Sequence, residues 1–129
     1  MELPITSALA GAAAIFLVLL SLPIANRRRT QSISYGDGGD TKFNNWIRAQ
    51  GNFIEYVPIA LIVIGLVEMG GYQQILVCGL AAALALGRLL HAFGLIAGAL
   101  IGRILGMILT WSTLLVAGGL LVYGQLVWV

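Results

Sequence analysis

The sequence has 129 residues, of which 60% are hydrophobic and only 9% are charged, and its formal net charge is +2. A soluble domain of this size needs far more charge on its surface, so the composition argues against a water-soluble protein. The apolar runs do not alternate with polar residues as barrel strands do, and the seven basic residues are too few and too scattered for a nucleic-acid surface. The sequence therefore predicts an all-α integral membrane protein.

Four apolar runs predict a bundle of four transmembrane helices in one membrane domain that covers residues 1–129. We place the helices at residues 4–25, 42–69, 72–95 and 102–127. Each is long enough to cross a hydrocarbon core of about 30 Å at about 1.5 Å per residue. The first run is too long for a signal peptide and lacks a basic start, so we expect it to be retained as a helix.

Small residues and polar caps predict how these helices are joined and packed. Residues 26–41 are the one long polar connection, and Asp40 or Thr41 is placed to cap the helix that follows. The third connection is apolar and is expected to break within residues 96–101. Small residues that allow close helix contact recur every four residues around it and also cluster in the first run: Gly94, Gly98, Gly102, Gly106 and Gly11-Ala12-Ala13-Ala14.

Two further expectations concern single side chains. Phe43 and Trp46, at the start of the second helix, are typical of anchors at the membrane surface. Cys78 is the only cysteine, which excludes an internal disulfide and a four-thiolate metal site. We interpret Cys78 as an inert thiol in the core, and we predict no metal site.

The basic residues lie on one side of the predicted four-helix arrangement. The other side has only Glu2 and Glu68, whereas the residues in and around the first and third connections include Arg27, Arg28, Arg29, Lys42, Arg48, Arg88 and Arg103. Because positive residues favour the cytoplasmic side, we expect both termini to face away from the cytoplasm.

The second helix carries charged and polar residues where a membrane helix normally has Leu or Val. At about 100° per residue, Arg48, Asn52 and Glu55 fall on one narrow stripe, and Tyr56 flanks it. Ionisable groups are costly inside a bilayer, so they face protein or water and usually mark a site. The stripe therefore predicts one wall of a functional pocket.

The other helices add cations at the same depth. Arg88 and His91 are three residues apart and share a face of the third helix, Arg103 opens the fourth, and residues 27–29 end the first. Together with the stripe they predict a basic pocket near the cytoplasmic face, with Glu55 as its one carboxylate. Such a pocket suits a small anionic ligand that also carries an ammonium group, and an arginine in it favours the thiolate form of a bound thiol.

A structural alternative is that Arg48 and Glu55 only pair with charges on other helices and hold the bundle together. A single four-helix chain has little interior in which to bury such groups. An oligomer that buries the stripe between subunits would solve this, and the small-residue faces are consistent with it.

The second-helix segment Arg48-Ala49-Gln50-Gly51-Asn52-x-x-Glu55-Tyr56-x-Pro58 resembles the signature of the MAPEG family, the membrane-associated proteins in eicosanoid and glutathione metabolism. The segment Gly87-Arg88-x-x-His91 resembles the third-helix motif of that family. The segment Tyr35-Gly36-Asp37-Gly38-Gly39 resembles its small bacterial, YecN-like branch. The four-helix layout matches along essentially the whole chain.

The resemblance implies a homotrimer in a bacterial inner membrane that binds glutathione as co-substrate at the subunit interfaces, near the cytoplasmic side. Carried over by position, the glutathione contacts are Arg48, Gln50, Asn52, Glu55, Tyr56, Arg88 and His91, with one of Arg27, Arg28 and Arg29 from the first helix. Arg103 corresponds to the arginine that stabilises the thiolate and is the predicted catalytic residue. The implied activity is that of a glutathione transferase or peroxidase that acts on lipophilic electrophiles or lipid hydroperoxides among the membrane lipids.

The third helix departs from the family pattern. Where well-studied eukaryotic members carry tyrosines that touch glutathione, this chain has His91 and Leu95. This difference keeps an alternative open, namely a non-catalytic membrane trimer whose pocket binds an anionic lipid or metabolite. A small transporter is less favoured, because no inverted repeat is evident.

Overall fold

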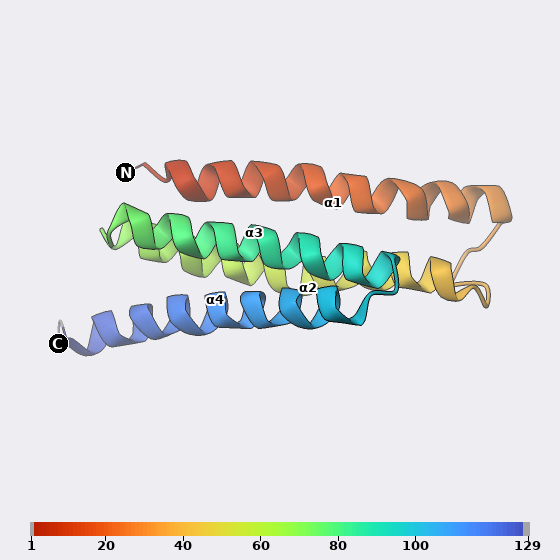
Figure 1. Ribbon diagram of the computed structural model, residues 1–129. Coiled ribbons are helices and arrows are strands. Elements are labelled where there is room, and N and C mark those ends of the chain that lie inside the picture. Colours follow the sequence, from red (N-terminus) through yellow and green to blue (C-terminus); the bar gives the residue numbers. More distant parts are fainter. Residues whose placement is uncertain (1, 128–129) are drawn as a thin grey trace.

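The computed structural model describes residues 2–127, and the chain folds into four long helices that run back and forth along one axis (Figure 1). Their bounds are α1 Pro4–Gln31, α2 Thr41–Met69, α3 Gln74–Ile96 and α4 Leu100–Val127. All four are long and apolar enough to cross a membrane, and the described residues contain no strand. The predicted all-α bundle of four spans is confirmed.

The two central helices are α2 and α3, and α1 and α4 pack on them from opposite sides (Figure 1). The N- and C-terminal ends lie at one end of the bundle, together with the α2–α3 connection. Residues 32–40 and 97–99, which join α1 to α2 and α3 to α4, lie at the other end. We refer to this second end as the basic end, because the arginine-rich segments adjoin it.

Helix α1 continues to Gln31 rather than ending at residue 25 as predicted, and Pro23 lies within it. The helix ends where Ser32 adopts the left-handed conformation (φ 53°) and donates its backbone N–H to the carbonyl of Arg28. Arg28 and Arg29 lie in the last turn, where positive charge interacts favourably with the helix dipole. The arginines that were predicted to follow the helix therefore help to extend it.

Asp40 caps α2, as predicted. Its carboxylate accepts a hydrogen bond from the backbone N–H of Phe43 (3.0 Å) and also pairs with Arg27 of α1. The hydrogen bond from Phe43 lowers the pKa of Asp40 below its ordinary value of 3.8, and the Arg27 charge acts in the same direction. Phe43 is buried, and its ring centroid lies 5.1 Å from the guanidinium of Arg27 and 5.6 Å from that of Arg28. The prediction that Phe43 is a membrane-surface anchor is therefore wrong, because these cations attract its ring inward.

The remaining helix ends agree with the prediction or differ from it by one or two residues. Helix α3 begins at Gln74 and ends at Ile96, and α4 begins at Leu100. The turn between them lies within the predicted break, and Gly98 adopts the positive φ of 73° that is unfavourable for other residues.

The backbones of α3 and α4 approach each other closely where glycines meet. A Cβ atom added to Gly106 would lie 2.6 Å from the carbonyl oxygen of Gly87 and 2.6 Å from the backbone nitrogen of His91. Gly94 and Gly102 also contact the backbone of the opposite helix. The glycine pattern therefore does serve helix packing, and it brings the His91 face of α3 against the start of α4.

Glu68 of α2 caps α1 at the opposite end of the bundle. Its carboxylate accepts hydrogen bonds from the backbone N–H groups of Ile5 (3.0 Å) and Thr6 (2.9 Å) and from the Thr6 hydroxyl (2.6 Å). The first N–H groups of a helix lack intrahelical partners and carry partial positive charge, so a carboxylate there is stabilising. No local signal predicts this contact, because its partners are 62 residues apart.

Two groups of buried apolar residues form the core. The group nearer the chain ends contains Ala60, Ile64, Val67, Val77, Leu80, Leu84 and Ala117, and the group nearer the basic end contains Leu20, Ala49, Phe53, Val57, Ala92 and Leu95. Cys78 is exposed, so its prediction as a core thiol is wrong. Gly11 has no neighbour within 4 Å of an added Cβ, so it forms no close helix contact within the chain, whereas Ala13 packs against the core group nearer the basic end.

Candidate functional site

The predicted stripe on α2 is divided between two environments. Arg48 and Glu55 are exposed on the outer surface, whereas Asn52 and Tyr56 are half-buried and contact α3. Neither Arg48 nor Glu55 forms an ion pair within residues 2–127. The alternative in which these two charges pair with other helices is therefore not realised within one described chain.

Arg88 of α3 is buried, with 4% of its surface exposed, and it connects three helices. Its Nη1 donates to Oδ1 of Asn52 at 2.6 Å, and its guanidinium carbon lies 5.6 Å from the ring centroid of Tyr56. Its Nη2 lies 3.4 Å from the carbonyl oxygen of Gly106 in α4. Among the described residues, its Nε has no hydrogen-bond partner and no carboxylate pairs with the guanidinium. Arg88 is thus a buried cation surrounded by neutral groups.

His91 lies almost one turn further along α3 and is 8% exposed. Its Nδ1 lies 3.1 Å from the backbone carbonyl oxygen of Arg103 at the start of α4. A carbonyl oxygen only accepts hydrogen bonds, so Nδ1 carries the proton and Nε2 is the free acceptor of the neutral ring. The side chain of Arg103 is exposed. His91 therefore fixes the backbone of the predicted catalytic residue to the helix that carries Arg88.

Three other predicted site residues lie away from Arg88 within one chain. Gln50 faces α1, where its Nε2 donates to the hydroxyl of Ser21 at 2.8 Å. Arg28 lies 3.4 Å from two carbonyl oxygens of the loop that follows α1, and Arg29 is exposed at the end of that helix. A single chain therefore brings Asn52 and Tyr56 into contact with Arg88, and His91 into contact with the backbone of Arg103.

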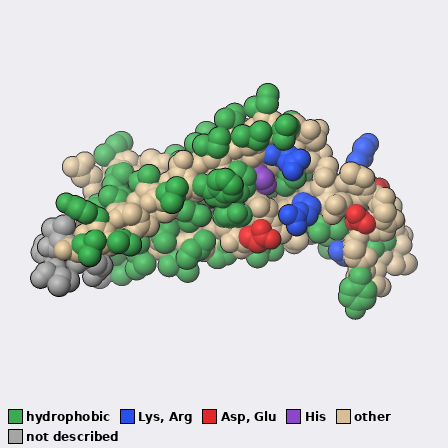
Figure 2. All heavy atoms as spheres, turned by 90° about the horizontal axis from the view of Figure 1, so that it is seen from below, with side chains coloured by type: hydrophobic (Ala, Val, Ile, Leu, Met, Phe, Trp, Pro, Cys, Tyr) green, Lys and Arg blue, Asp and Glu red, His purple; other side chains and the backbone are tan. Residues whose placement is uncertain are grey.

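Charged side chains gather over one part of the molecular surface. On the face shown in Figure 2, the Lys, Arg, Asp, Glu and His side chains lie in the right-hand half of the view, the half that contains the basic end. Hydrophobic side chains dominate the rest of this face. The exposed charges are thus confined to one part of a face that is otherwise suited to lipid.

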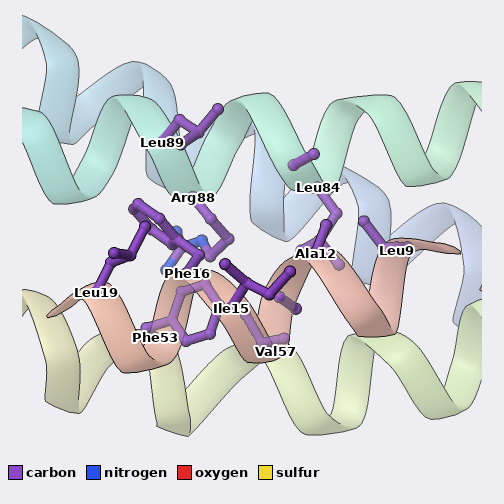
Figure 3. Close-up of a pocket in the computed structure, with 12 residues that line it drawn as sticks. Leu9, Ala12, Ile15, Phe16, Leu19, Phe53, Val57, Leu84, Arg88 and Leu89 are labelled. Atoms are coloured by element: carbon purple, nitrogen blue, oxygen red, sulfur yellow. The ribbon is translucent and has the colours of Figure 1, made fainter. Parts of the chain in front are cut away.

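An apolar cavity of about 360 Å³ opens between α1, α2 and α3 beside Arg88 (Figure 3). Of the described residues that line it, Arg88 alone is polar. Figure 3 shows Arg88 extending from α3 towards Phe16 and Phe53 on the other two helices. The sequence did not predict this cavity; its one sequence signal is the small-residue run that includes Ala12 and Ala13, which both line it.

Comparison with known proteins agrees with the helix arrangement and the two motifs. The MAPEG family model matches residues 6–123. The chain belongs to the MAPEG family. It is 35% identical over 104 residues to the inner membrane protein YecN of Escherichia coli strain K12, and the alignment covers 79% of this chain and 78% of that relative. The YecN protein of Escherichia coli O6:H1 strain CFT073 matches to the same extent.

Membership of the MAPEG family, which is known for glutathione-related roles, establishes the general class of the protein. Four apolar helices and relatives named as inner membrane proteins identify it as an integral inner-membrane protein. The two MAPEG-like motifs lie on neighbouring helices, α2 and α3, and the hydrogen bond between Asn52 and Arg88 joins them.

Proposed function

We propose that the protein is a glutathione-dependent membrane transferase, with peroxidase-like activity, that acts on lipophilic electrophiles or lipid hydroperoxides. The observation that carries the proposal is that Arg48 and Glu55, about one helical turn on either side of Asn52, are exposed, as is Arg103, while Asn52 is bonded to the buried Arg88. Charged side chains are costly where they face lipid. A ligand, a neighbouring subunit or both must therefore cover this surface in the membrane.

The neighbouring subunit, in this proposal, belongs to a homotrimer with glutathione bound between subunits near the basic end. Gln50, Arg28 and Arg29 lie away from Arg88 within one chain. In a site shared between subunits, these residues contact glutathione from the adjacent chain. The basic end faces the cytoplasm in this arrangement, as the positive residues favour.

The ammonium group and one carboxylate of glutathione have counterparts in the chain. Glu55 complements the ammonium group, and Arg48 offers the planar fork that binds a carboxylate through two hydrogen bonds. Asn52 both donates and accepts, and Arg88 holds it in place. Arg103 lies nearest the sulfur in this arrangement and lowers the free energy of the thiolate relative to the thiol.

The thiolate is the nucleophile in both proposed reactions. In conjugation its sulfur forms a bond to an electrophilic carbon, the leaving group departs with its electron pair, and the thiol proton passes to solvent. In hydroperoxide reduction the sulfur attacks the terminal peroxide oxygen, the O–O bond breaks, and the alkoxide is protonated to an alcohol. A second glutathione then converts the resulting sulfenic acid to the disulfide with release of water. The charges on α2 orient the peptide, and Arg103 stabilises the sulfur anion before attack.

A non-catalytic trimer that binds an anionic lipid or metabolite is the second candidate. Helix α3 contains no tyrosine, serine or threonine, so it offers no hydroxyl to a thiol. Leu95 is buried, and Nδ1 of His91 is occupied by the Arg103 carbonyl. These observations favour a site that binds a ligand without catalysing a reaction.

The two candidates are separated by titrating the detergent-solubilised protein with glutathione and following binding by calorimetry. We expect binding in the millimolar range or tighter, and we expect Glu55→Gln to weaken it by about tenfold, the effect of losing one charge-assisted contact. Glu2→Gln is the matched control, because Glu2 is also an exposed carboxylate but lies at the opposite end of the bundle. Absence of glutathione binding at millimolar concentration contradicts the proposed function and favours the second candidate.

The catalytic part is tested with Arg103→Ala and a soluble aryl halide as electrophile. We expect this variant to bind glutathione and to lose at least about tenfold in kcat, because its thiolate is less stabilised. An unchanged kcat in the Arg103→Ala variant would show that Arg103 has no catalytic role.

A further inference from the structure

His91 of α3 makes one hydrogen bond to the first turn of α4, from its Nδ1 to the backbone carbonyl oxygen of Arg103 (3.1 Å). We propose that His91 is a positioning residue for Arg103, which holds the backbone of α4 so that the Arg103 guanidinium meets the glutathione sulfur. This inference rests on the proposed function, in which Arg103 stabilises the thiolate. It gives His91 a different role from the direct glutathione contact that the family resemblance implies.

The first observation is how little of His91 a ligand can reach. Only 8% of its surface is exposed in a single chain, and a subunit packed over the site can only reduce that fraction. Its Nδ1–H is used by the Arg103 carbonyl, which leaves Nε2, an acceptor in the neutral ring. The polar contact that His91 makes is therefore with the backbone of its own chain.

The second observation is that α3 contacts the backbone of Arg103 at its nitrogen as well as at its carbonyl. A Cβ atom added to Gly94 would lie 2.6 Å from the backbone nitrogen of Arg103, so no side chain separates the two helices there. A Cβ atom added to Gly106 would lie 2.7 Å from the Cβ of His91. The first turn of α4 is thus in close contact with α3, and the bond from His91 fixes its orientation within that contact.

The third observation is that α4 itself holds this turn weakly. The helix begins at Leu100, and the backbone nitrogen of Arg103 lies 3.4 Å from the carbonyl oxygen of Ala99, longer than the usual value of about 3.0 Å. The first turn of a helix lacks some of its hydrogen bonds and opens more readily than the interior. The bond from His91 therefore supplies a restraint that the helix does not.

Restraint of this turn affects the thiolate more than the binding of the peptide. A fixed cation stabilises an anion without first being reoriented, and a misplacement of about 1 Å can lower a rate about a hundredfold. The groups proposed to bind the ammonium group and a carboxylate of glutathione, Glu55 and Arg48, are on α2. Loss of the bond from His91 is therefore expected to raise the pKa of the bound thiol and to leave the affinity for glutathione almost unchanged.

Two amide substitutions separate positioning from direct contact. The amide nitrogen of asparagine reaches about as far as Nδ1 of histidine, and that of glutamine about as far as Nε2. His91→Asn retains a donor for the Arg103 carbonyl, so we expect it to keep the thiol pKa of the parent chain. We expect His91→Gln and His91→Leu to lower the ratio of thiolate to thiol at neutral pH by about tenfold.

The measurement uses full-length protein in detergent with glutathione at saturation. A pH titration of the ultraviolet absorbance of the thiolate gives the pKa of the bound thiol, and calorimetry gives the affinity. Thr113→Val is the control, because it removes a hydrogen bond of 2.9 Å from a buried side chain further along α4, and its thiol pKa is expected to equal that of the parent chain. If His91→Gln retains the parent values and His91→Asn weakens glutathione binding, His91 contacts the ligand through Nε2 and the proposal is wrong.

Hydrogen exchange without ligand distinguishes a failure of this inference from a failure of the proposed function. We expect the amides from Arg103 to Met107 to exchange at least about tenfold faster in His91→Gln and His91→Leu than in the parent chain, and at the parent rate in His91→Asn. Unchanged exchange in both loss variants overturns the positioning role whether or not glutathione binds. Faster exchange in a protein that binds no glutathione supports the role of His91 in holding Arg103 and contradicts the proposed function.

Discussion

Arg88 and Asn52 are joined across the α2–α3 interface by a hydrogen bond of 2.6 Å between Nη1 and Oδ1. Arg88 belongs to the third-helix motif and Asn52 to the second-helix motif. The bond therefore gives the two motifs one physical connection. It also gives a buried guanidinium one of its few polar contacts, which makes its loss costly.

The first prediction concerns this bond. Asn52→Leu is expected to lower the free energy of unfolding by about 1–3 kcal/mol, because it leaves a buried charged donor without its acceptor. Thermal unfolding in detergent measures the change. Asn44→Leu is the control, since Asn44 is exposed near the start of the same helix, and its effect is expected to stay within about 0.5 kcal/mol. Equal effects of the two variants would show that the bond contributes little.

The second prediction concerns the close contact of α3 and α4. Gly106→Ala is expected to destabilise the protein by about 1–3 kcal/mol, because the new methyl group meets the backbone of α3 at 2.6 Å and forces the helices apart. Gly119→Ala in the same helix has open space and is expected to be neutral or slightly stabilising, since alanine favours helix by about 1 kcal/mol. Comparable unfolding temperatures for the two variants would contradict the packing argument.

The third prediction concerns the cap of α1. Glu68→Gln is expected to speed hydrogen exchange at the amides of Ile5 and Thr6, because a neutral side chain interacts less well with the helix N-terminus. The loss of stability is expected to be about 1 kcal/mol. Mass spectrometry of amide exchange measures the local effect. Glu2→Gln, at an exposed position close to the same helix end, should leave both amides protected as in the parent chain.

The fourth prediction concerns the pH dependence of the α1–α2 connection. The pKa of Asp40 is lowered by the backbone hydrogen bond from Phe43 and by Arg27. A carboxyl whose pKa is lower in the folded state stabilises the fold above its unfolded pKa, and the stabilisation is lost as the pH falls through the folded pKa. Stability from Asp40 is thus expected to be constant near neutral pH and to decline below its ordinary pKa of 3.8.

Asp40→Asn provides the measurement for this effect. The asparagine retains a capping oxygen but does not titrate. The unfolding temperature of the Asp40→Asn protein should therefore fall less steeply with decreasing pH than that of the parent chain. Parallel curves for the two proteins below the ordinary pKa would show that Asp40 does not contribute to the acid sensitivity.

The helix count and the polar stripe could be predicted because each depends on local pattern. Length and hydropathy decide which runs can cross a membrane, and the helical period places Arg48, Asn52 and Glu55 on one face. The end of α1 was predicted too early in the sequence, because a polar segment with three arginines is also typical of a loop. In the fold, the Ser32 turn and the favourable interaction of those cations with the helix terminus extend the helix to Gln31.

The sequence by itself determined the membrane class, the four spans, the concentration of cations at one end and the residues that carry the family motifs. Only the tertiary structure decided which of these side chains meet. It buried Arg88 against Asn52, exposed Arg48 and Glu55, and left an apolar cavity beside the guanidinium. The reason is that helical periodicity fixes only the direction of each side chain on its own helix. The partners of a side chain and the cavities beside it depend on how closely neighbouring helices approach each other. The glycine contacts set that distance between α3 and α4, but not at the other helix interfaces.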